Sequence, residues 1–129
     1  MIKEGSSILD LGCGNGTLMQ MLRDERKCNC TGIEISPSGV DACKSKGLHV
    51  VQGSIDQPLQ YKSRSFDYAV CNVTLQMVHK PEVVLAEMSR VAKYSIISFP
   101  NFGYLSNRIE LLLKGKMPAK MLFGYSWYN

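Results

Sequence analysis

Ile8-Leu9-Asp10-Leu11-Gly12-Cys13-Gly14-Asn15-Gly16 is the stretch that decides the fold of this 129-residue chain. An apolar run leads into an acid and then into three glycines at alternate positions, which predicts a buried strand, a tight turn and the start of a helix. Glycine allows positive φ and has no Cβ, so a ligand can approach the backbone N–H groups of the turn and the N-terminus of the helix. We therefore expect this turn to bind a ligand.

The residues in and around the turn narrow the class of that ligand. A dinucleotide-binding turn needs a third glycine where this chain has Thr17, which disfavours an NAD-dependent oxidoreductase, and the turn lacks the Gly-Lys-Ser/Thr ending of a phosphate-binding loop. Asp10 would repel a pyrophosphate but suits a ligand that carries an ammonium and a sulfonium group. These features indicate S-adenosylmethionine (SAM). The alternative is a turn that binds no nucleotide, with Asp10 as a helix cap.

A second acid, Glu34, lies near the end of the next predicted strand, residues 30–35. Rossmann-like folds place the carboxylate that binds the ribose hydroxyls at about this separation. An ionised carboxylate has two acceptor oxygens and no donor, so it can accept from both vicinal hydroxyls. Glu34 thus supports the SAM interpretation, and we expect Glu34→Ala to weaken SAM binding with little change in fold stability.

Length and composition are those of one ordinary globular domain. The net charge of +4 is too small to indicate a nucleic-acid partner. The five cysteines are scattered and lack paired Cys-x-x-Cys spacing, so we expect no metal site and reduced thiols in the cytoplasm. Neither a secretory h-region nor a run of eighteen apolar residues occurs, and we expect no export and no membrane span.

Strand and helix signals alternate along the chain, which is typical of an α/β fold with a parallel sheet and covering helices. The predicted strands are residues 6–11, 30–35, 48–52, 65–71 and 94–99, and the predicted helices are 17–26, 37–46, 81–91 and one ending at Gly115. The periodicity places Leu18, Met21, Leu22, Val40, Ala42, Cys43, Val84, Leu85, Met88 and Val91 on buried helix faces.

The glycine turn with Asp10 and Glu34 resembles motif I of the class I SAM-dependent methyltransferases. This resemblance implies a Rossmann-like three-layer sandwich with a mostly parallel sheet, forming a single domain over residues 1–129. That class has seven strands where five are predicted here. We therefore expect the last two strands to be missing and the chain to be a fragment, truncated after the fifth strand.

The turn after the third strand, Gly53-Ser54-Ile55-Asp56, carries in the methyltransferase superfamily an acid that contacts the adenine amino group. Here Ser54 follows the glycine and Asp56 comes two residues later, so Asp56, Ser54 or only the backbone of Ile55 could meet the base. An Asx-type turn capped by Asp56, without a ligand role, explains the residues equally well.

Asn72 to Gln76 follow the fourth strand, where open α/β sheets place substrate-facing residues. They do not form the Asn/Asp-Pro-Pro-Tyr/Phe signature, which disfavours methylation of planar amino nitrogens. His79 is a weak candidate for a general base, because a loop residue before a helix explains it better. The apolar and basic stretch from Phe102 to Lys120 could bind RNA, a membrane or a partner protein, form a lid over the pocket, or pack against further chain.

Blocks in the second half look like the bacterial methionine-biosynthesis family MetW. The blocks are Thr74-Leu75-Gln76-Met77, Val84-Leu85-Ala86-Glu87-Met88-Ser89-Arg90-Val91, Ser98-Phe99-Pro100-Asn101-Phe102-Gly103-Tyr104, Leu111-Leu112-Leu113-Lys114-Gly115-Lys116-Met117-Pro118 and Tyr125-Ser126-Trp127-Tyr128. This resemblance implies a cytoplasmic bacterial protein that works beside a homoserine O-acyltransferase, and it names no methyl acceptor. Two departures are Ser54, where the family usually has an acid, and an end at Asn129, beyond which the family usually continues.

Two functions remain open: a methyltransferase acting on an unidentified acceptor, with S-adenosylhomocysteine as product, and a non-catalytic SAM-binding partner subunit of the acyltransferase. No catalytic residue is assigned. The predicted cofactor-binding residues are Asp10, Gly12, Cys13, Gly14, Asn15, Gly16, Glu34, Ile35, Ser54, Ile55, Asp56 and Asn72.

Overall fold

The computed structural model describes residues 2–101 and 105–115 and divides into two compact units, Met1–Phe99 and Pro100–Asn129. The first unit is built around five parallel strands in the order β3-β2-β1-β4-β5. These strands are β1 (Ser7–Leu11), β2 (Asn29–Glu34), β3 (His49–Gln52), β4 (Phe66–Asn72) and β5 (Ala92–Ser98). The helices are α1 (Thr17–Arg26), α2 (Pro37–Ser45), the short 3₁₀ helix η1 (Leu75–Met77) and α3 (Pro81–Val91). Each predicted strand lies within two residues of an observed one.

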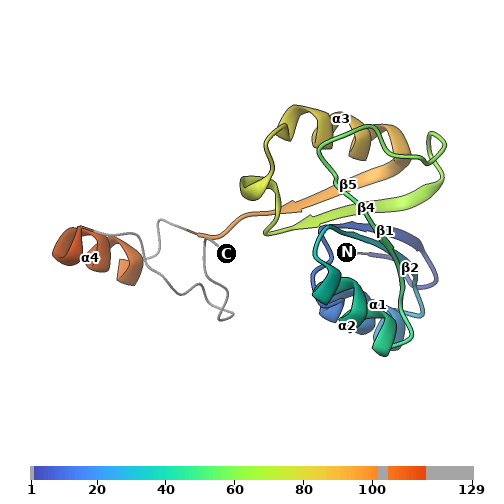
Figure 1. Cartoon of the computed structure of the whole chain (residues 1–129), viewed down its shortest axis with the longest axis horizontal. Helices are drawn as coiled ribbons and strands as arrows, with labels where there is room; N and C mark the ends of the chain where they lie inside the picture. The colour runs from blue at the N-terminus through green and yellow to red at the C-terminus, as the bar shows by residue number, and fades with distance from the viewer. Residues whose placement is uncertain (1, 102–104, 116–129) are drawn as a thin grey trace. The chain divides into compact units, whose positions relative to one another are not determined.

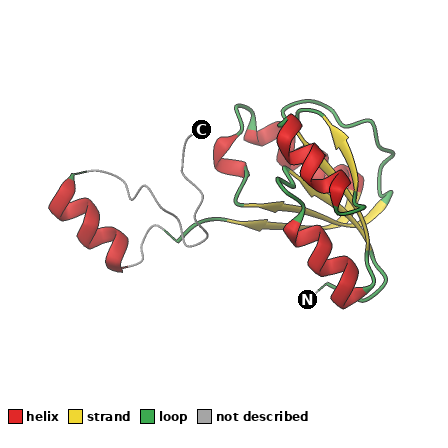
Figure 2. Cartoon of the chain, turned by 60° about the horizontal axis from the view of Figure 1, so that its bottom comes forward, coloured by secondary structure: helices red, strands yellow, loops and turns green. Residues whose placement is uncertain are grey.

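Helices cover the sheet on both faces (Figures 1 and 2), which confirms the three-layer α/β architecture. Along β1, Leu9 and Leu11 pack into the cluster that α3 closes, whereas Ile8 packs into the cluster under α1 and α2. All three side chains are fully buried. A central parallel strand buried on both faces explains why the sequence of β1 is apolar without alternation.

In two of the predicted helices, one residue of the predicted apolar face is exposed. In α1 the buried residues are Met19 and Leu22, while Met21 is 46% exposed. In α3, Val84, Met88 and Val91 are fully buried, while Leu85 is 39% exposed. A short helix lying on a sheet buries a narrow stripe at i, i+3 or i+4 and i+7, and a neighbour one residue away is rotated by about 100° from it.

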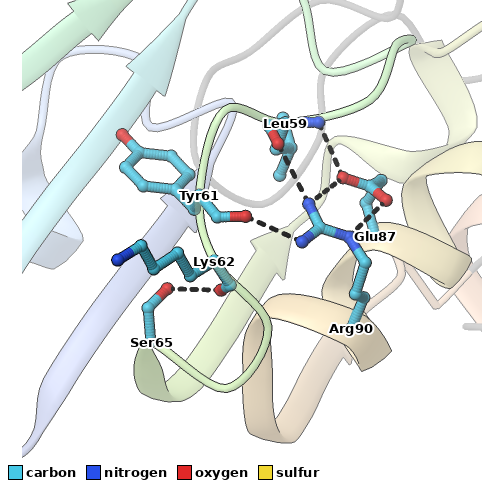
Figure 3. A network of polar contacts seen from close by, with 6 residues as sticks. All are labelled: Leu59, Tyr61, Lys62, Ser65, Glu87 and Arg90. Carbon is cyan, nitrogen blue, oxygen red and sulfur yellow. Dashed lines mark hydrogen bonds and ion pairs between the residues drawn. The ribbon is translucent and has the colours of Figure 1, made fainter.

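Arg90 and Glu87 of α3 fasten the long connection between β3 and β4 (Figure 3). The Arg90 guanidinium donates to the carbonyl oxygens of Leu59, at 2.9 Å, and Tyr61, at 2.7 Å. Glu87 accepts from Arg90 and from the Leu59 N–H, both at 2.6 Å, and the Arg90 contact lowers the pKa of Glu87. The fork geometry of arginine suits this set of acceptors. These contacts hold a loop without regular secondary structure against the helix.

The second unit contains α4 (Leu105–Lys114), which is the predicted helix ending before Gly115. Gly115 has φ +61° and donates its N–H to the Leu111 carbonyl oxygen, which closes the helix. The predicted apolar residues Phe102 and Tyr104, like the aromatic segment after Lys116, lie outside the described residues. Among the helices of the described ranges, none has the length and apolarity needed to cross a membrane.

Candidate functional site

The predicted site residues converge at the carboxyl edge of the sheet. The glycine turn follows β1, Glu34 ends β2, and Asn72 ends β4. Strand order reverses at β1, which has β2 on one side and β4 on the other. Open α/β sheets bind ligands outside the carboxyl ends of the strands at this kind of switch point.

The three glycines of the turn all have positive φ but differ in their surroundings. A Cβ on Gly12 would lie 2.4 Å from Thr74 Cγ2, and one on Gly16 would lie 2.5 Å from Leu48 Cδ1. A Cβ on Gly14 would have no atom of the described chain within 4 Å. Gly12 and Gly16 therefore serve close packing within the protein, and Gly14 is the glycine that keeps space open beside the turn.

Glu34 ties the end of β2 to the glycine turn. Its Oε2 accepts the N–H of Gly14 and its Oε1 accepts the N–H of Ser36, both at 2.8 Å, and the side chain is buried. A Cβ on Gly39 would lie 2.8 Å from Glu34 Cγ, so this position on α2 leaves room for the acid. The carboxylate keeps further lone pairs for ligand hydroxyls. It also has a structural role that we did not expect from the sequence.

Asp10 is 2% exposed, and its Oδ1 makes no hydrogen bond within the part of the chain that the structure describes. Burial, and to a smaller extent the negative charge of Glu34, raises the pKa of Asp10 to about 7. A buried acceptor without a partner is costly unless a donor or a cation reaches it. The site thus has an unmet demand for positive charge or a hydrogen-bond donor next to the glycine turn.

The residues expected around adenine differ in accessibility. Ile35 is 68% exposed, whereas Ile55 is buried. The carboxylate of Asp56 accepts the N–H of Lys80 at 2.8 Å, which, with a similar contact from His79, lowers the pKa of Asp56. Ser54 Oγ accepts the Asp56 N–H at 3.1 Å, so the serine rather than the aspartate closes this turn.

Cys13 and Asn15 take part in the structure of the turn. Cys13 Sγ lies 3.8 Å from Cys43 Sγ, and burial together with the Cys43 contact raises the pKa of the Cys13 thiol well above its usual range. Asn15 Oδ1 accepts the N–H and the hydroxyl of Thr17, at 3.1 and 2.7 Å. A neutral buried thiol is unreactive, so the Cys13 side chain contributes packing. Its backbone N–H donates to the Ile33 carbonyl oxygen at 3.1 Å, and its carbonyl oxygen accepts the Gly16 N–H at 2.9 Å, so its backbone also holds the turn together.

Sequence reasoning placed Thr74 in the substrate-facing segment but did not predict its contact with the glycine turn, and it missed Ser98. Thr74 packs on Gly12 and donates its hydroxyl to the Gly12 carbonyl oxygen at 3.3 Å. Ser98 is the register partner of Asn72 across β4 and β5, and its hydroxyl donates to Asn72 Oδ1 at 2.5 Å. A parallel pairing of the two strands was the signal that could have placed Ser98 beside Asn72. His79 is exposed in the loop before α3.

Solved structures of similar fold identify the fold class. A SAM-dependent methyltransferase of Thermotoga maritima, described as a possible histamine N-methyltransferase, superposes with a TM-score of 0.71 at 24% identity, covering 88% of this chain and 53% of that one. The [4+2]-cyclase SpnF superposes with a TM-score of 0.62 at 27% identity, covering 71% and 36%. With its strand order and glycine turn, the chain has the Rossmann-like fold of the SAM-dependent methyltransferases.

Within that class, the family model for the methionine biosynthesis protein MetW matches residues 1–129. The bifunctional methionine biosynthesis protein MetXA/MetW of Rhodopirellula baltica is 35% identical over the whole of this chain. The chain belongs to the MetW family. It spans 22% of the length of that relative.

The different roles of the glycines predict which substitution separates binding from folding. Gly14→Ala places a methyl group in the open space at positive φ, so we expect a stability cost of about 1–2 kcal/mol and a loss of affinity for S-adenosylhomocysteine of at least tenfold. Gly5→Ala is the matched control, because Gly5 has φ +73° and a Cβ there would also have no atom within 4 Å, but it precedes β1, at the opposite end of that strand from the turn. Urea unfolding and calorimetric titration measure the two effects, and equal affinities in the two variants would contradict the assignment.

The raised pKa of Asp10 predicts a pH-dependent stability. The folded protein retains the Asp10 proton up to about pH 7, whereas the unfolded chain releases it near pH 3.8. Between these values the folded state binds more protons, so the free energy of unfolding falls as pH rises and this loss is complete above about pH 7. The asparagine side chain of Asp10→Asn cannot ionise. Without ligand, the free energy of unfolding of this variant should therefore rise relative to that of the wild type by about 1–4 kcal/mol between pH 4 and pH 8. A constant difference between the two unfolding free energies would show that Asp10 is ionised throughout.

Proposed function

We propose that the glycine turn, Asp10 and Glu34 bind SAM and that the protein is a methyltransferase acting on an acceptor not yet identified. The turn and Asp10 hold the methionine moiety, Glu34 holds the ribose hydroxyls, and adenine lies near Ile35 and the turn Ser54 to Asp56. The observation that carries this proposal is the buried Asp10 Oδ1, which has no hydrogen-bond partner among the described residues and belongs to the residue two positions before the glycine turn, in which Gly14 has open space.

Charge supports SAM over a dinucleotide. Asp10 and Glu34 both come from strand ends at one edge of the sheet, and the charge of Glu34 raises the cost of a negative charge on Asp10. A pyrophosphate would add to that cost, whereas an ammonium and a sulfonium group would offset it. The same electrostatics that raise the pKa of Asp10 therefore favour a cationic ligand.

SAM supplies an electrophilic methyl group on a sulfonium, which a nucleophile can displace in line. The protein's contribution is then mainly to hold the two partners in alignment, and such positioning can account for much of the rate. The segment from Asn72 to Gln76, at the end of β4 and against the glycine turn through Thr74, is where we place the acceptor. A dedicated catalytic base is not required by this chemistry.

A second function is favoured by the relatives. The Rhodopirellula baltica protein combines MetXA and MetW in one chain, and the SpnF cyclase shows that this fold does not fix the reaction. A non-catalytic SAM-binding subunit that regulates a homoserine O-acyltransferase fits these relatives. Under either function we place the protein in the bacterial cytoplasm, where its free cysteines stay reduced.

Calorimetric titration of the full-length protein with SAM, S-adenosylhomocysteine and NADH tests the proposal. We expect micromolar binding of both adenosyl ligands and no binding of NADH, because of the two acids. A change in SAM affinity when the acyltransferase is added would favour the regulatory function. Absence of adenosyl binding under every condition would refute both functions.

Glu34 provides the sharpest variant. Loss of two acceptor oxygens should weaken S-adenosylhomocysteine binding by roughly 1.5–3 kcal/mol in Glu34→Ala. Because the N–H groups of Gly14 and Ser36 also lose their acceptor, the free energy of unfolding should fall by about 1–3 kcal/mol, in contrast to the expectation from sequence alone. Titration below the unfolding transition separates the two effects, with the exposed Glu25→Ala as control. Unchanged affinity would remove Glu34 from the ribose site.

A further inference from the structure

The carboxyl ends of β4 and β5 carry a short chain of hydrogen bonds with a defined direction. Val73 N–H donates to Ser98 Oγ at 3.1 Å and to the Ser98 carbonyl oxygen at 3.2 Å. The Ser98 hydroxyl in turn donates to Asn72 Oδ1 at 2.5 Å. Asn72 and Ser98 are register partners on neighbouring strands, so the pairing of the sheet itself holds them together.

The direction of this chain determines which end of the Asn72 amide faces outward. A backbone N–H can only donate, so Ser98 Oγ accepts from Val73 and has one proton left to give. With the Asn72 amide reversed, the NH₂ group would face Ser98 Oγ, and the Ser98 proton would lose the Asn72 oxygen as its acceptor. The oxygen of Asn72 therefore faces Ser98, and the NH₂ group is the end left available on this exposed side chain.

The backbone at Val73, which directly follows Asn72, is held in an unfavourable conformation. Val73 has φ +56°, which is rare for a β-branched residue and costs roughly 1–3 kcal/mol. Its N–H is held by Ser98, and its carbonyl oxygen accepts the side-chain amide of Gln76 at 2.8 Å. Strain that surrounding contacts maintain in this way is concentrated at functional sites.

The strained segment lies against the proposed cofactor site. Thr74 donates its hydroxyl to the carbonyl oxygens of Asn72, at 3.1 Å, and Gly12, at 3.3 Å. Thr74 therefore links the segment that carries Asn72 directly to the glycine turn. A group bound at the Asn72 amide would lie at the same edge of the sheet as a ligand in that turn.

We propose that the Asn72 NH₂ group is a fixed hydrogen-bond donor for a carboxylate or carbonyl oxygen of the methyl acceptor, and that Ser98 is the positioning residue that sets its direction. This inference rests on the proposed function, because it assumes that an acceptor lies beside the SAM site. It defines the class of methyl acceptor. The part of the acceptor that contacts the Asn72 NH₂ group has an oxygen with lone pairs, and an ammonium group does not bind at this position.

The test follows the side-chain amide signals of Asn72 by NMR in the ¹⁵N-labelled full chain loaded with S-adenosylhomocysteine. Asn72→Asp identifies these signals by their disappearance. Sodium acetate is the carboxylate probe and methylammonium chloride is the matched cation. We expect acetate to shift the Asn72 signals in a saturable manner and methylammonium at the same ionic strength to leave them unchanged.

Ser98→Ala tests the positioning role, because it removes the hydroxyl while the Ser98 carbonyl oxygen still accepts the Val73 N–H. We expect acetate to bind at least threefold more weakly in this variant. Ser98→Thr should restore the affinity, and Ser95→Ala, at an exposed position on the same strand, should match the wild type.

Three results would overturn the inference: no acetate response, an equal response to methylammonium, or equal acetate affinity in Ser98→Ala and Ser95→Ala. An S-adenosylhomocysteine titration precedes each experiment. It distinguishes failure of this inference from failure of the proposed function. Loss of that binding refutes the proposed function, whereas intact loading without the acetate response refutes only the role of Asn72.

Discussion

The two hydrogen bonds from the Glu34 carboxylate to the N–H groups of Gly14 and Ser36 are the interaction on which the site depends. They join the turn after β1 to the start of α2, and so fix two loops that are separate in the sequence. Buried N–H groups of a turn need acceptors, and a carboxylate can supply two at once. Gly39 provides the room for it, because a larger residue there would meet the acid. The glycine turn is thus held open by a side chain from the neighbouring strand.

The Glu34 carboxylate stabilises the glycine turn and at the same time destabilises the ionised form of Asp10. The charge on Glu34 adds to burial in raising the pKa of Asp10, so the protein without ligand contains an acid that resists ionisation. A cationic ligand would remove this penalty. Binding energy and fold stability are consequently set by the same pair of acids, which is a common compromise where a site is built from buried charge.

Strand positions, the acid at the end of β2 and the glycine turn could be predicted because their signals are local. Periodicity and glycine spacing depend on a few neighbouring residues, and they placed every strand of the sheet. The buried faces of α1 and α3 were harder to predict. In α1, Met19 is buried instead of Met21, and in α3, Leu85 lies outside the buried face. The packing of Gly12 on Thr74, and the bond between Ser98 and Asn72, come from contacts between distant segments. No local pattern predicts those contacts.

The central place of β1 in the sheet has a consequence for how the chain folds during synthesis. β1 pairs with β2 on one side and with β4 on the other, and Ser7 bonds to Asp67, sixty residues later. The strands β1 to β3 pair with one another, and all of them are made before β4 and α3. One edge of β1 and the apolar side chains that α3 later covers stay open to water until the second half emerges. The nascent chain therefore exposes an unpaired strand edge beside an apolar face, a combination that favours association with other chains.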